Sequence, residues 1–133
     1  MKMVMTIEAA LAREFVRTHE AMSLNGCQGG ETDLALGVKE DGPVSAAALL
    51  SAEGEELTIL HWAAESESDW LLMDAVVTEA SARQCTRVRG EYVSTGSNDE
   101  MREYLAQFGF TMIGEDETTT LWILPVSAYE PMG

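Results

Sequence analysis

The feature that most constrains the fold is a pair of apolar runs joined by an Asp-Gly dipeptide. Leu34, Leu36 and Val38 alternate with other residues as in a half-buried strand, and a second apolar run covers residues 44–50. Asp41-Gly42 lies between the runs. This dipeptide favours the tight turn of a β-hairpin, because that turn needs positive φ angles. We therefore expect an antiparallel pair of strands at residues 32–39 and 44–50.

The rest of the chain alternates helical and strand patterns. The predicted helices cover residues 6–22, 66–84 and 98–108, and the further strands cover residues 57–63, 85–93, 110–113 and 118–126. Thr6 is expected to cap the first helix. Residues 1–5 and 127–133 are expected to be tails of a single domain spanning residues 1–133. This order predicts an α/β (α+β) fold with a mixed, mainly antiparallel sheet and helices on both faces.

The chain carries a large negative charge. Its 133 residues include 23 acidic and 8 basic side chains, for a formal net charge of −15. Such a charge repels nucleic acids and anionic membranes, which proteins bind through Lys and Arg. No apolar run approaches the roughly 18 residues that cross a membrane, and the first residues lack a secretion signal. We therefore expect a cytoplasmic protein that binds neither nucleic acid nor membrane.

The sulfur and imidazole groups form no metal-binding pattern. Cys27 and Cys85 lie far apart, and His19 and His61 are the only histidines. A structural zinc site needs about four Cys or His ligands. No metal site is predicted, and both cysteines are expected to be reduced thiols.

The most specific pattern lies between residues 89 and 110. It reads Arg-Gly-Glu-Tyr-Val-Ser-Thr-Gly-Ser-Asn from Arg89 and Tyr-Leu-Ala-Gln-Phe-Gly-Phe from Tyr104. This region resembles the last half of a GNAT N-acetyltransferase domain and, more narrowly, the C-terminal GNAT-like domain of the FkbH-like family. The positions that match the FkbH-like pattern are Gly90, Glu91, Tyr92, Thr95, Asn98, Gly109, Phe110 and Trp122. Residues 15–26 are also similar to the segment preceding that domain, so the resemblance covers residues 15–122.

The resemblance implies a reaction class and a cofactor position. FkbH-like proteins make glyceryl-carrier-protein units for polyketides, which implies acyl transfer in natural-product biosynthesis on a small-molecule or carrier-bound acyl substrate. GNAT enzymes hold acetyl-CoA or another acyl-CoA where the central strand passes into the following helix. The corresponding cofactor-binding residues here are Trp62, Ala63, Ala64 and Ser66, with Asn98 near the pantetheine arm.

The loop at this position departs from the usual Gln/Arg-x-x-Gly-x-Gly/Ala pattern. Trp62 takes the basic position, and Glu65 and Glu67 take the two small ones. Carboxylates here oppose a diphosphate, because like charges about 4 Å apart near a protein surface repel by roughly 4 kcal/mol. Ser66 and Asp69 have the spacing of a capping box, which would satisfy the first amides of the helix internally. We therefore expect CoA binding to be lost or strongly weakened, and no cofactor is assigned.

Three residues are candidates for proton transfer. Glu91 and His61 are candidate general bases. Tyr104 is a candidate acid, although it lies one residue before Leu105, the position at which many GNAT enzymes place a Tyr that protonates the leaving thiolate. Each has a structural alternative: an Arg–Glu pair at the rim of the sheet for Glu91, a satisfied structural imidazole for His61 and a buried helix residue for Tyr104.

Arg87 and Arg89 alternate with Glu91 on one face of a predicted strand and are candidate ligands for an anionic substrate group. Arg83 completes the only arginine cluster, at which an acidic carrier protein would dock. Two hypotheses follow. In the first, the protein is an acyltransferase-type enzyme or a descendant of one with altered chemistry. In the second, it is a non-catalytic GNAT-like module that binds a partner or small ligand. A homodimer is compatible with both.

Overall fold

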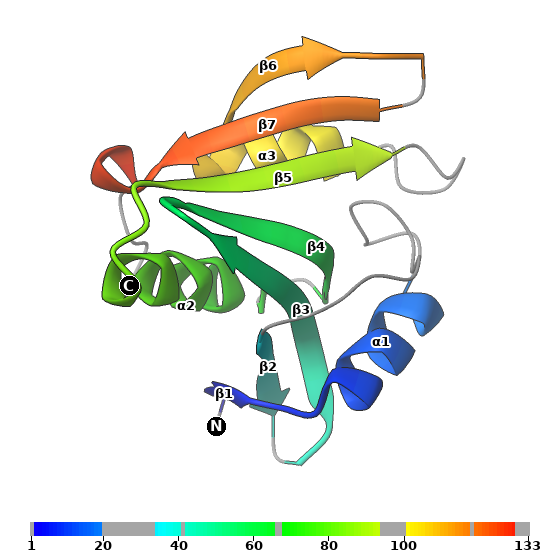
Figure 1. Ribbon diagram of the computed structural model, residues 1–133. Coiled ribbons are helices and arrows are strands. Elements are labelled where there is room, and N and C mark those ends of the chain that lie inside the picture. The colour runs from blue at the N-terminus through cyan, green and yellow to red at the C-terminus, as the bar shows by residue number, and fades with distance from the viewer. Residues whose placement is uncertain are drawn as a thin grey trace.

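A seven-stranded sheet with helices on both faces forms the computed structural model in Figure 1. The structure describes residues 2–19, 34–40, 42–65, 68–93, 101–117 and 119–129. The strands are β1 (Lys2–Thr6), β2 (Leu34–Glu40), β3 (Val44–Glu53), β4 (Glu56–Ala64), β5 (Arg87–Val93), β6 (Thr111–Glu115) and β7 (Thr119–Pro125). Helix α1 (Ala9–Thr18) packs on one face, and α2 (Asp69–Ala82) and α3 (Met101–Phe108) pack on the other. The predicted fold class is confirmed.

The strands lie in the order β1-β2-β3-β4-β5-β7-β6. Only β4 and β5 are parallel among these neighbours, so the sheet is mainly antiparallel. The predicted hairpin is present as β2 and β3. The parallel pair is joined through α2, which returns the chain across the sheet as a strand–helix–strand connection requires.

The N-terminal segment differs from the prediction. Residues 2–6, expected as a tail, form the edge strand β1 and pair with β2. Thr6 pairs with Leu36, so it does not cap the first helix, which begins at Ala9. Met3 and Val4 are 55% and 38% exposed. An edge strand with no well-buried face leaves no alternation of apolar and polar residues for sequence patterns to detect.

Two β-bulges adjust the sheet beside the end of β4. Leu49 pairs with His61 whereas Leu50 pairs with Ile59, which leaves Leu60 as an extra residue in β4. Similarly, Val38 pairs with Ala46 and Lys39 with Val44, so Ser45 is an extra residue in β3. A bulge displaces one residue from the ladder and changes which side chains face each side.

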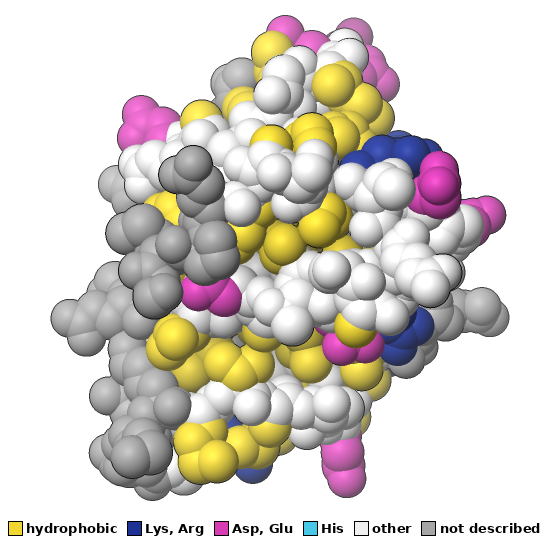
Figure 2. All heavy atoms as spheres, turned by 90° about the vertical axis from the view of Figure 1, so that its left-hand side faces the viewer, with side chains coloured by type: hydrophobic (Ala, Val, Ile, Leu, Met, Phe, Trp, Pro, Cys, Tyr) yellow, Lys and Arg dark blue, Asp and Glu magenta, His cyan; other side chains and the backbone are white. Residues whose placement is uncertain are grey.

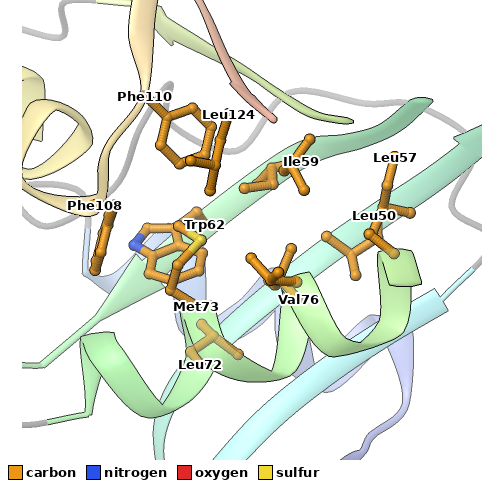
Figure 3. Packing of buried hydrophobic residues seen from close by; sticks show 14 of the residues in the cluster. Leu50, Leu57, Ile59, Trp62, Leu72, Met73, Val76, Phe108, Phe110 and Leu124 are labelled. Atoms are coloured by element: carbon orange, nitrogen blue, oxygen red, sulfur yellow. The ribbon is translucent and has the colours of Figure 1, made fainter. Parts of the chain in front are cut away.

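The bulge at Leu60 decides which side chains of β4 enter the main core. Leu57 and Ile59 face α2 before it, and Trp62 and Ala64 face α2 after it. Trp62 is the largest side chain that is fully buried. Its ring contacts Phe108 of α3 edge-on, with 5.9 Å between centroids, and lies beside Met73 of α2 in Figure 3. The end of β4 is therefore fixed by both helices of this face.

The Gly109-Phe110 step is a helix terminator. The amide of Gly109 donates to the carbonyl of Ala106 and the amide of Phe110 donates to that of Leu105, which is the Schellman arrangement. Gly109 has a φ of 103°, a conformation that L side chains rarely adopt. Part of the pattern behind the family resemblance is thus explained by the way α3 ends.

The chain continues past β7 as an ordered segment, where a tail was expected from residue 127. Val126–Ala128 form a 3-10 turn, η2, and the Tyr129 hydroxyl donates to the Asp74 carboxylate of α2. Burial, followed by the hydrogen bond and charge of Asp74, raises the pKa of Tyr129. A hollow of about 500 Å³ lies beside this contact, against α2 and η2.

Figure 2 views the molecule from the left of Figure 1 and shows hydrophobic side chains exposed between acidic ones.

Within the described residues, no helix is long and apolar enough to span a membrane.

Candidate functional site

The candidate site lies where β4 and β5 separate. The two strands pair from Glu56 with Arg87 to Ile59 with Gly90, although β4 continues to Ala64 and β5 to Val93. Figure 1 shows the two strands diverging beyond this point. The divergence follows directly after Ile59, where β4 takes up the extra residue Leu60. The bulge in β4 is thus the local feature at which the sheet opens.

The structure brings Glu91 and His61 to this opening on one face of the sheet. Glu91 is the first residue of β5 beyond the paired region, and His61 follows the bulge in β4. His61 pairs with Leu49, which packs under α1, and Glu91 lies on the same side because its neighbours Gly90 and Tyr92 face the other core. His61 is 4% exposed, whereas the Glu91 side chain is 48% exposed. Glu91 is therefore the more accessible of the two candidate bases.

The arginines of β5 are engaged by carboxylates. Arg87 Nε lies 3.0 Å from Glu56 Oε2, and Arg89 lies 3.5 Å from Glu56 Oε1 and 3.8 Å from Glu91 Oε1. Arg83 pairs with Glu79 at 2.8 Å. The Arg–Glu pair named as the structural alternative is thus present. An anionic substrate would have to compete with these carboxylates for Arg87 and Arg89.

The predicted cofactor residues of β4 lie at the end of the strand but present little side chain to solvent. Trp62 is 1% exposed, Ala63 0% and Ala64 6%. Trp62 carries no positive charge, and its ring is directed into the core, so it cannot replace the Gln or Arg of the family pattern. A ligand at this position would meet mainly the backbone of β4.

Three predicted residues cannot be placed with their side chains. Ser66 and Asn98 lie outside the described residues, and Tyr104 lies in α3 with its side chain outside them. Leu105, at the position of the family's acid, is 1% exposed and belongs to the core. A side chain at that position of α3 therefore points inward in this protein.

The turn between β4 and α2 uses several of its own amides. The Glu65 amide donates to the Ser45 carbonyl at 2.9 Å, and the Ser68 amide donates to the Glu65 carbonyl at 3.1 Å. The Trp70 amide donates to Asp69 Oδ1 at 2.9 Å. These three amides are therefore not available to a diphosphate, whose binding at a helix N-terminus depends on free N–H groups.

The helix after this turn begins later than predicted. Its first residue is Asp69 and its N-cap is Ser68, so the predicted start at Ser66 is wrong. The Ser68 hydroxyl makes no cap hydrogen bond and instead lies 2.8 Å from the Ser45 hydroxyl, with both residues buried. Ser45 also donates to the Val38 carbonyl. The bulged serine of β3 thus holds the turn through its hydroxyl and its carbonyl.

The carboxylate of Glu65 faces the end of α1. His19 Nε2 lies 3.3 Å from Glu65 Oε1. The imidazole stacks on Phe15, with 3.9 Å between centroids, and its Nδ1 lies 2.9 Å from the Phe15 carbonyl. Glu65, which takes one of the two positions where the family pattern has a small residue, is therefore paired with a histidine from a distant part of the chain.

Sequence reasoning missed Ser45 and His19 as parts of the site. Ser45 follows a β-turn and belongs to no motif, whereas His19 lies in residues 15–26, a segment for which the family resemblance implied no role at the site. A bulge and a contact between elements 46 positions apart depend on tertiary packing, so no local pattern marks them. The only sequence signal was the negative charge of the loop, because carboxylates are stabilised by a positively charged or hydrogen-bonding partner nearby.

Comparison with solved structures shows the GNAT fold. The ribosomal-protein-S18-alanine N-acetyltransferase of Escherichia coli has a TM-score of 0.70 at 15% identity, over 99% of this chain and 98% of that one. An N-acetyltransferase from Staphylococcus aureus scores 0.66 at 11% identity, over 95% and 99%. The protein yncA of Salmonella typhimurium, whose structure includes its cofactor acetyl-CoA, scores 0.66 at 11% identity, over 98% and 96%. No family model matches the chain, and no curated protein matches its sequence. At these identities, the similarity concerns the fold alone.

Proposed function

We propose that the protein is an acyltransferase-type enzyme that takes its acyl group from a thioester held between β4 and β5, without binding a nucleotide diphosphate at the β4–α2 turn. The observation that carries this proposal is the contrast within one site. The strands diverge beside two candidate bases, whereas the turn that follows bears Glu65 and uses at least three amides internally, those of Glu65, Ser68 and Trp70.

The reaction follows from the position of Glu91. An amine or hydroxyl group of the acceptor attacks the thioester carbonyl carbon, and Glu91 takes the proton that the attacking group loses. The carbon–sulfur bond breaks, and the leaving thiolate takes a proton from water. A positioned base of this kind contributes about a hundredfold to ten-thousandfold to such a rate. His61, buried on the same face, orients the acceptor or assists the proton transfer.

The family resemblance supports a donor carried on a protein in natural-product biosynthesis. A carrier protein presents its acyl group on a phosphopantetheine arm, which reaches the β4–β5 opening without a diphosphate. The carrier would dock near Arg83, Arg87 and Arg89, although each of these side chains has a carboxylate partner. Arg89→Glu should then abolish binding of an acyl-carrier protein while binding of acyl-pantetheine persists.

A comparison of two small thioesters tests the donor site. Acetyl-pantetheine and acetyl-CoA should bind with dissociation constants within about threefold of each other at neutral pH, because the diphosphate adds no net attraction. Calorimetry measures both constants. A much tighter constant for acetyl-CoA would overturn the proposal, and so would a lack of acetyl-pantetheine binding.

The catalytic step is tested separately. Glu91→Gln should lower the rate of acyl transfer from acetyl-pantetheine to an amine by about a hundredfold or more, with the dissociation constant of the donor unchanged. Glu117→Gln, on an exposed turn, is the matched control and should keep the full rate.

The second candidate is a non-catalytic module that binds a thioester or a partner through the same opening. The internally bonded turn favours it equally, because a binding module also has no need for CoA. It predicts that acetyl-pantetheine binds while wild-type protein transfers no acyl group to any amine or alcohol offered, and that Glu91→Gln changes nothing.

A further inference from the structure

The hollow beside the contact between Tyr129 and Asp74 has no part in the proposed reaction. Its volume is about 500 Å³, which is within the range of sites that bind small molecules. One wall is the C-terminal half of α2, and Val126 and Tyr129 form the other wall, after β7. The Val126 amide donates to the Thr86 carbonyl at 2.9 Å, which ties the second wall to the start of β5. The hollow is therefore bounded by two ordered elements.

Three polar side chains of α2 line the hollow, those of Asp74, Thr78 and Ser81. Residues four and three positions apart are neighbours on a helix surface, so the three groups follow one another along a single stripe. The Thr78 hydroxyl donates to the Asp74 carbonyl at 2.7 Å, which leaves the lone pairs of its oxygen free to accept. The stripe therefore presents a carboxylate and hydroxyl oxygens to a hydrogen-bond donor in the hollow.

The carboxylate of Asp74 has a hydrogen-bond donor beside it but no cation. The Tyr129 hydroxyl donates to it and carries no charge. Burial, followed by the hydrogen bond and the charge of Asp74, raises the pKa of Tyr129, so the hydroxyl stays protonated and remains a donor. No described Lys, Arg or His forms an ion pair with Asp74. A positively charged donor in the hollow would therefore make a charge-assisted hydrogen bond to it.

The end of α2 favours a cation as well. The hollow extends along the helix to Ala82, its last residue. The carbonyl groups at a helix C-terminus carry partial negative charge, which stabilises nearby cations. The last turn of α2 contains no basic residue, and the next residue, Arg83, is paired with Glu79 at 2.8 Å. The helix end and Asp74 therefore attract positive charge to the same place.

We propose that this hollow binds a small primary ammonium ion with an apolar body. The three N–H donors of the ammonium group suit the carboxylate and the hydroxyl oxygens of α2. The apolar body packs on Val77 and Val126, which line the hollow. The ring of Tyr129 lines it too, and an aromatic face within about 6 Å attracts an ammonium group. The net charge of −15 raises the concentration of such cations around the protein.

This site is separate from the opening between β4 and β5. Pro125 pairs with Arg87, the first residue of β5, and the wall formed by η2 follows Pro125 directly. Glu91 lies farther along β5, beyond the residues that pair with β4, and on the face of the sheet opposite α2. The ammonium site and the acceptor site therefore do not overlap, and the proposal does not rest on the proposed function.

Phenethylammonium is the probe, and 2-phenylethanol is the matched control because it has the same apolar body without the charge. Titration of the full chain at about pH 7, followed by amide NMR shifts, should give a dissociation constant of about 1 mM or tighter for the ammonium ion. Binding of the alcohol should be at least tenfold weaker. The shifts should lie in residues 74–82 and 126–129. Equal affinities, no binding below about 10 mM, or shifts confined to the β4–β5 opening would contradict the proposal.

Variants identify the groups that hold the ammonium ion. Asp74→Asn should weaken its binding at least tenfold, because the amide oxygen still accepts from Tyr129 but has no negative charge. Glu103→Gln changes the net charge equally, on an exposed position of α3, and should keep the constant within about twofold. Thr78→Val should weaken binding by about threefold, because one acceptor is lost. If Asp74→Asn binds as tightly as Glu103→Gln, the proposal is wrong.

Glu91→Gln separates this site from the acceptor site. It should leave the binding of phenethylammonium at residues 74–82 unchanged, whatever it does to acyl transfer. A loss of binding there in Glu91→Gln would show that the ammonium ion occupies the acceptor site instead, and the proposal would fail. The comparison of the ammonium ion with the alcohol uses wild-type protein, so it decides the question even if Asp74→Asn does not fold.

Discussion

The β4–α2 turn and the α3–β6 turn both join a helix to a strand, but different forces shape them. The α3–β6 turn is closed by bonds among residues 105–110 and by one glycine with a positive φ. The β4–α2 turn is held by Ser45 from β3 and by His19 from the end of α1. The α3–β6 turn is therefore encoded locally, and the β4–α2 turn is assembled by tertiary contacts.

This difference explains why a sequence pattern indicates the structure of the α3–β6 turn but is misleading about that of the β4–α2 turn. Glycine is favoured wherever a helix must end in this way, whatever the protein does. The turn beside the candidate site responds to its partners, so its charges and hydrogen bonds can change while the fold persists. Four substitutions test whether the two turns depend on different contacts.

The largest effect is expected at the residue that connects the two turns. Trp62 lies on β4 just before one turn and packs on Phe108, the last residue of α3 before the other. Trp62→Ala should destabilise the protein by about 3–5 kcal/mol, because it removes a fully buried indole. Urea denaturation measures the loss, with the exposed Leu71→Ala as a nearly neutral control. A small loss would mean that the two turns are not joined through this contact.

The locally encoded turn should depend on its glycine. Gly109→Ala should cost about 2 kcal/mol, because the residue has a φ of 103°, a backbone conformation that L side chains rarely adopt. Thermal unfolding measures the change. Gly54→Asn is the matched control: its φ of 61° suits Asn, and nothing lies within 4 Å. Equal losses at both positions would show that the φ angle of Gly109 is not the reason for its presence.

The assembled turn should depend on Ser45 instead. Ser45→Ala should cost about 1.5 kcal/mol, because it leaves the buried Ser68 hydroxyl without its partner. The double variant Ser45→Ala/Ser68→Ala should lose less than the sum of the single variants, since no hydroxyl is then orphaned. Chemical denaturation gives all three values. Additive losses would indicate that the two hydroxyls do not interact.

The smallest effect is a gain. Gln84 ends α2 as Gly109 ends α3, with amides of Gln84 and Cys85 donating to Ser81 and Ala80, but it has a φ of 63° without being glycine. Gln84→Gly should stabilise the protein by about 1 kcal/mol, because the left-handed conformation no longer costs a side-chain clash. A rise in the melting temperature checks this. No rise would mean that the freedom of glycine in the unfolded chain cancels the gain.

Much of the fold followed from the sequence, because the hairpin at Asp41-Gly42 and the helix end at Gly109 are local signals. β1 did not, since its side chains are too exposed to show a pattern. At the site, Glu91 and His61 could be named as residues, but their placement on one face depended on the bulge at Leu60. The partners of Glu65 and Ser68 could not be foreseen, because each lies on a distant element.

The extra residue at Leu60 also affects how this protein should be matched to its structural neighbours. In a structural neighbour that lacks this extra residue, equivalent residues can be assigned by counting forward from the start of β4 or back from α2. The two counts then differ by one position. An alignment that forbids a gap inside the strand would equate His61 with a core position and Trp62 with one under α1. Residue equivalences with these structural neighbours should therefore be drawn separately for the two halves of the strand.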